Sequence, residues 1–123
     1  MRKSPSISYE IELAEKHNYE KGKARAYNLI AIVEASFGND IKAIEYNEKS
    51  LKIGEEIKDA NTIRNAVNDL GNLYANAGKY DIALAYYQRC LIIGKQENNI
   101  LGISFTKFNI GLIYDQVNNK EQA

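Results

Sequence analysis

The chain has 123 residues with 16 basic and 16 acidic side chains, so its formal net charge is zero. An apolar content of 45% with 26% charged residues is typical of one small globular domain and excludes an intrinsically disordered chain. The zero balance also argues against a broad electrostatic attachment to nucleic acid or to an anionic membrane, because both need clustered Lys and Arg.

The rare residue types exclude further classes. A single Cys cannot form an internal disulfide, and a single His beside it is too few ligands for a typical zinc site. No apolar run approaches the length of a membrane-spanning helix, and none follows the basic start to make a secretion signal. We therefore expect a cytoplasmic protein that uses no metal and no cofactor.

A forty-residue period runs through the sequence without a gap. Small residues recur at this interval, as at Ala31, Gly71 and Gly111. Large aliphatic residues recur in the same way, as at Ile30, Leu70 and Ile110. A fixed period of this length indicates a repeat architecture, in which each unit buries its apolar face against the next unit.

Each period contains two apolar stripes with steps of three and four residues, and this spacing predicts two helices. In chain order the six predicted helices span 5–17, 21–37, 41–57, 60–77, 81–97 and 100–117. In the best-defined unit, Asp59 is expected to cap the start of its helix, and Gly78 is expected to take the left-handed conformation after the end.

The middle unit carries a family resemblance. The run Asn68–Tyr74, followed by Gly78 and Tyr80 and then by Ala83 and Tyr87, resembles the tetratricopeptide repeat. The forty-residue period is similar to the long-repeat class found in kinesin light chain and in bacterial regulatory proteins. The resemblance implies an all-α, right-handed α-solenoid of antiparallel helix pairs, which acts as a binding scaffold without chemistry of its own.

The phase of the repeat predicts how the chain is divided. Residues 1–20 would be the second helix of a truncated repeat, 21–60 and 61–100 two full repeats, and 101–123 the first helix of another. Neither end carries a polar capping face, which solenoids need for solubility. We expect either a fragment of a longer array or a homo-oligomer that covers these terminal helices.

Four asparagines step by three, four and four along the predicted helix 60–77, and Asn disfavours helices. In the resembling family, the first helix of each unit lines a concave groove, where Asn amides hold the backbone of an extended peptide. The alternative is a plain solvated face. The candidate partner-binding residues are Asn28, Asn65, Asn68, Asn72, Asn76, Phe105, Phe108 and Leu112.

No pattern resembles a catalytic or metal site, so we do not expect an enzyme. The favoured function is a scaffold that binds a peptide or protein partner in its groove. The alternative is a regulatory, self-associating segment of a larger bacterial signalling protein, such as a sensor kinase or a transcription regulator.

Overall fold

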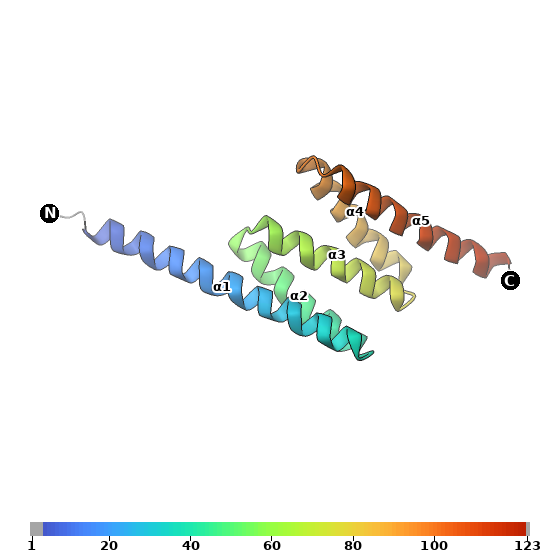
Figure 1. Cartoon of the computed structure of the whole chain (residues 1–123), viewed down its shortest axis with the longest axis horizontal. Helices are drawn as coiled ribbons and strands as arrows, with labels where there is room; N and C mark the ends of the chain where they lie inside the picture. The colour runs from blue at the N-terminus through green and yellow to red at the C-terminus, as the bar shows by residue number, and fades with distance from the viewer. Residues whose placement is uncertain (1–3, 123) are drawn as a thin grey trace.

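The computed structural model describes residues 4–122, with side chains placed for residues 8–119. Over this range the chain forms five helices joined by short turns, and it contains no strand (Figure 1). Their bounds are α1 Ser4–Ser36, α2 Asp40–Ile57, α3 Ala60–Asn76, α4 Tyr80–Gln96 and α5 Ile100–Gln122.

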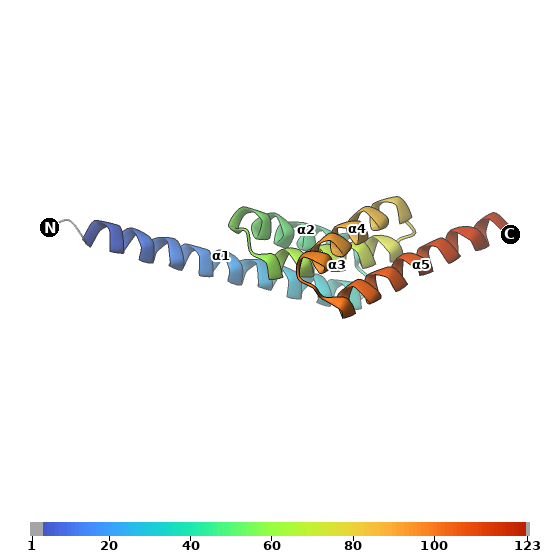
Figure 2. The same cartoon turned by 90° about the horizontal axis from the view of Figure 1, so that it is seen from above.

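Each helix packs against the next one along the chain, and α1 also touches α3. The result is a row of helix pairs, from which the first half of α1 and the last part of α5 extend at opposite ends (Figures 1 and 2). The forty-residue period appears directly in the helix starts: α2 and α4 begin at Asp40 and Tyr80, and α3 and α5 begin at Ala60 and Ile100.

Capping residues set the ends of the helices inside the row. The Asp59 carboxylate accepts hydrogen bonds from the Thr62 backbone N–H at 3.1 Å and from the Thr62 hydroxyl at 2.6 Å. These bonds stabilise the first turn of α3, as the sequence predicted. Gly78 has a φ of +78°, a conformation that glycine adopts without strain, so its predicted role after α3 is also confirmed.

The prediction of six helices is wrong at the N-terminus. Helices predicted at 5–17 and 21–37 are joined into the single 33-residue α1. In the other two units a left-handed residue, Lys58 or Asn98, follows the second helix, and the next residue, Asp59 or Asn99, caps the following helix.

The equivalent pair in α1 is Asn18–Tyr19. A tyrosine side chain cannot accept the N-terminal backbone N–H groups as an N-cap does. No Pro stands in this connector to force a break, and Gly22 keeps helical backbone angles, so the helix continues through it.

Contacts between successive pairs form the core. Leu51 of α2 packs in one cluster with Val67 and Leu70 of α3 and with Cys90 of α4. A second cluster joins Leu73 of α3 to the preceding pair α1–α2. Because each cluster draws on two pairs, no pair in the row completes its core alone.

The closest approach inside a pair occurs at Gly71. A Cβ atom built there would lie 2.7 Å from the Tyr87 ring, too close for any side chain without a shift of the ring. Tyr87 is only 2% exposed, so it has little room to move. The small residue predicted at this column is therefore required by the contact between α3 and α4.

We expect Gly71→Ala to destabilise the fold by about 1–3 kcal/mol, because the ring and the helix must move apart. Gly111→Ala is the matched control: it occupies the same repeat position on α5, where an added Cβ meets nothing within 4 Å. That substitution should raise stability by up to about 1 kcal/mol through helix propensity. Urea unfolding of both variants would measure this difference, and equal effects would contradict it.

Candidate peptide-binding groove

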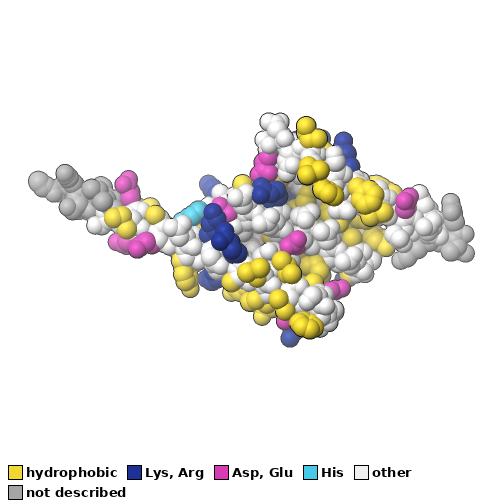
Figure 3. Space-filling view, in the orientation of Figure 1, with side chains coloured by type: hydrophobic (Ala, Val, Ile, Leu, Met, Phe, Trp, Pro, Cys, Tyr) yellow, Lys and Arg dark blue, Asp and Glu magenta, His cyan; other side chains and the backbone are white. Residues whose placement is uncertain are grey.

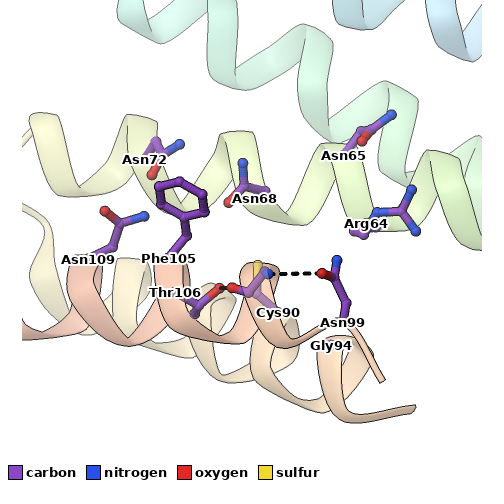
Figure 4. Close-up of a pocket in the computed structure, with 11 residues that line it drawn as sticks. Arg64, Asn65, Asn68, Asn72, Cys90, Gly94, Asn99, Phe105, Thr106 and Asn109 are labelled. Carbon is purple, nitrogen blue, oxygen red and sulfur yellow. Dashed lines mark hydrogen bonds between the residues drawn. The ribbon is translucent and has the colours of Figure 1, made fainter. Parts of the chain in front are cut away.

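A groove lies between α3 and α5, with α4 beneath it. It consists of two adjoining hollows of about 380 and 550 Å³ that share Asn72 and Asn109. Cys90 and Gly94 of α4 line the first hollow from below (Figure 4). The groove exists because α3 and α5 each pack on α4 and leave open the space between them.

Asparagines from α3 form one wall. Asn65, Asn68 and Asn72 line the first hollow, and Asn72 and Asn76 line the second. Within the described part of the chain, the amides of Asn65, Asn68 and Asn76 are exposed and make no hydrogen bond. Their donors and acceptors are free to bind a ligand.

Asn72 differs from its neighbours because its side chain is already engaged. Its Oδ1 accepts a hydrogen bond of 2.5 Å from the Tyr87 hydroxyl. Burial raises the pKa of Tyr87 to about 12, so this hydroxyl keeps its proton and remains a donor at neutral pH. Asn72 thus holds the Tyr87 ring in place under the groove.

Asn28, the matching asparagine of α1, does not line either hollow. Its amide nitrogen donates to Asn47 Oδ1 and to Asp69 Oδ2, both at 2.8 Å, and so ties α1 to α2 and α3. Burial raises the pKa of Asp69, and the bond from Asn28 partly opposes this shift. The structure therefore gives Asn28 a role in joining helices, and it separates this residue from the other candidates.

α5 supplies the opposite wall. Phe105 is 61% exposed and points across the first hollow toward Asn68 and Asn72 (Figure 4). Leu112 lines the second hollow. Phe108 lies outside both hollows, in a shallow surface depression that it shares with Leu101 and Phe105. The expected apolar side of the groove is thus formed by Phe105 and Leu112.

The groove carries almost no net charge. Arg64 stands at one end, where its guanidinium donates two hydrogen bonds to the Glu97 carboxylate at 2.8 and 3.0 Å. The other residues of both hollows are uncharged. A neutral lining with amides on one side and an aromatic ring on the other suits uncharged backbone and apolar side chains.

Sequence reasoning missed Asn109, which borders both hollows, and Asn99, which lines the first. Asn109 occupies the repeat position of Asp69, so the period alone placed it one residue away from the asparagine stripe of α3. Asn99 was readable as an N-cap: its Oδ1 accepts from the Gly102 backbone N–H at 3.0 Å.

One thiol lines the groove, that of Cys90 on α4. Burial raises its pKa to about 11, so the thiol stays protonated and unreactive at neutral pH. Among the described residues, no group of three or more His, Cys, Asp or Glu could hold a metal ion. No helix in that same range is long and apolar enough to cross a membrane.

The raised pKa values of Cys90 and Tyr87 predict a loss of stability in alkali. Both groups are neutral in the fold and ionise more easily when unfolded, so stability should be constant below about pH 9 and should fall as the pH approaches 11. Thermal unfolding across this range measures the effect. Cys90→Ser, which copies Ser50 of the preceding unit, should make the decline shallower; an unchanged slope would contradict the contribution of Cys90.

Two comparisons with known proteins bear on this architecture. A family model described as a tetratricopeptide repeat matches residues 65–99, which cover most of α3, all of α4 and the turn before α5. The chain is also 37% identical over 68 residues to the uncharacterized protein ycf37 of Guillardia theta, a match that covers 55% of the chain.

The chain spans about a third of the length of that curated relative, since the match covers 35% of it. Tetratricopeptide repeats are generally non-catalytic modules of protein interaction. Residues 65–99 thus match the tetratricopeptide repeat model, and the resemblance of the chain to this family is confirmed.

Proposed function

We propose that this chain is a protein-interaction scaffold that binds an extended peptide segment in the groove between α3 and α5. The observation that carries the proposal is the row of exposed, unbonded amides of Asn65, Asn68 and Asn76 along one wall. A peptide backbone offers alternating N–H and C=O groups, and an amide side chain can pair with both.

The opposite wall adds selectivity. Phe105 and Leu112 are 61% and 47% exposed, and each stands across the groove from the asparagine wall. Burying such side chains against an apolar residue of the ligand contributes about 25 cal/mol per Å². The favoured ligand is thus an uncharged peptide stretch with an apolar anchor beside Phe105.

We further propose, from the sequence, that the superhelix is right-handed and that its repeats begin at residues 21, 61 and 101. The same proposal places the protein in the cytoplasm and gives it no nucleic-acid or membrane partner. Attachment to a sensor kinase or a transcription regulator remains the alternative. It would use the same scaffold as a regulatory segment.

The proposal predicts which side chains a bound peptide needs. Short peptides selected from a random display library should bind the wild type. They should bind the double variant Asn65→Ala/Asn68→Ala about ten- to a hundredfold more weakly, because hydrogen bonds contribute about 0.5–1.5 kcal/mol each. Asn72 is left intact, since its loss would also release Tyr87. Fluorescence polarisation with a labelled peptide measures the change.

Asn119→Ala is the matched control, an exposed asparagine near the end of α5 that lines neither hollow. It should bind the selected peptides like the wild type. If the double variant bound them with unchanged affinity, or if no peptide were selected, the groove would not be the binding site.

A further inference from the structure

The C-terminal half of α1 exposes an apolar face that the repeat buries elsewhere. Ile30 is 39% exposed, whereas Leu70 at the same repeat position is 0% exposed. Val33 is 53% exposed, whereas its equivalents Leu73 and Ile113 are 7% and 3% exposed. Ala26 and Leu29 are exposed beside them, and Figure 3 shows hydrophobic side chains gathered along this half of α1.

The helix that covers this face in the other units identifies what is missing. Leu51 of α2 packs on Val67 and Leu70 of the following α3. One period earlier, the equivalent of Leu51 is Ile11, and the equivalent of Leu70 is Ile30. The repeat pattern therefore predicts that the sequence of the N-terminal half of α1 fits against that of its C-terminal half, in antiparallel orientation.

The two halves of α1 also fit each other in size. A Cβ added at Gly54 would lie 2.8 Å from a methyl group of Thr62. In this contact Gly54 has no side chain, and the Thr62 side chain fills the space. At the equivalent positions the sizes are exchanged: Ala14 has the Cβ, and Gly22 has none and is open to solvent. The pair Ala14 and Gly22 thus preserves the fit between the two halves.

Within one chain this contact cannot form, because α1 is continuous. Ile11 and Ile30 are nineteen residues apart in a straight helix, about 28 Å at 1.5 Å per residue. The N-terminal half extends away from the rest of the molecule (Figures 1 and 2). A second copy can cover this face with the N-terminal half of its own α1. The first copy then covers the same face of the second copy in the same way.

We propose that two copies of this chain pair antiparallel along α1, so that residues 8–20 of each copy cover the apolar face at residues 26–33 of the other. The continuous helix places residues of both contact halves on one side: Ile11, Gly22, Leu29 and Val33 fall within about 40° of one another at 3.6 residues per turn, and Ala14 and Ile30 flank this stripe about 60° to either side. A two-fold symmetric pairing requires this shared side.

Charge supports the same occupant. Residues 8–20 hold four Glu and one Lys, whereas residues 21–36 hold three basic residues and one Glu. Lys21 and Lys23 already pair with Asp59 and Glu20, and within the described range Arg25 has no ionic partner. In the antiparallel register, Arg25 of one copy lies level with Glu15 of the other, which is also exposed and unpaired.

The first test measures the molar mass in solution by light scattering over a dilution series. We expect twice the 13.9 kDa of one chain for the wild type. Leu29→Asp should raise the dimer dissociation constant at least about tenfold, because it places a charge in the apolar contact. Ile92→Asp on α4 is the matched control, since Leu29 and Ile92 are 57% and 56% exposed, and it should remain dimeric.

The second test separates exchange between copies from a closed hairpin. Ile11→Cys/Ile30→Cys, built in a Cys90→Ser background, is treated with a short bismaleimide crosslinker and run on a denaturing gel. We expect a covalent dimer from the double variant and none from an Ile92→Cys variant in the same background. A crosslink within one chain, no crosslink, a monomeric wild type, or a dimer unaffected by Leu29→Asp would each overturn the proposal.

Neither test depends on the groove, because the pairing face is on α1 and both hollows lie between α3 and α5. Circular dichroism of each variant checks that it remains helical. A folded, monomeric Leu29→Asp variant that still bound the selected peptides would support the pairing and leave the proposed function intact.

Discussion

The contact between the Tyr87 ring and the backbone of α3 at Gly71 determines much of the structure around the groove. It sets the distance between α3 and α4, because no side chain can occupy the space between them. The Tyr87 hydroxyl also donates a hydrogen bond to Asn72 Oδ1, so the packing contact orients one residue of the asparagine wall. The core cluster of Ala83, Tyr87 and Ile113 then fixes α5 on the far side.

Periodicity predicted α2 to α5 well, because their helices begin and end at residues with a local physical cause. Asp59 and Gly78 are examples: one caps a first turn and the other accepts a positive φ, and both properties belong to the residue itself. The break predicted before residue 21 failed for the converse reason. The forty-residue period predicted a turn there because the other units have one. That turn depends on a capping side chain, which Tyr19 does not supply.

The groove was predictable only in part. Helical spacing placed Asn65, Asn68, Asn72 and Asn76 on one face, and that placement holds in α3. Spacing could not tell which amides are free, because the partner of Asn72 is fifteen residues away and the Asp69 partner of Asn28 is forty-one residues away. Such partners are known only once the helices are packed. Asn28 and Asn68 therefore occupy equivalent repeat positions and have different surroundings.

The continuity of α1 depends on very few side chains, and this has an evolutionary consequence. Asn18 stands at the position of Asn98, which adopts the left-handed conformation in the turn after α4. Only its neighbour Tyr19 departs from the capping residues Asp59 and Asn99 of the other units. Both Asp and Asn codons differ from a Tyr codon by a single nucleotide. One point mutation at residue 19 can thus supply the capping side chain that starts the following helix in the other units, while the groove residues stay unchanged.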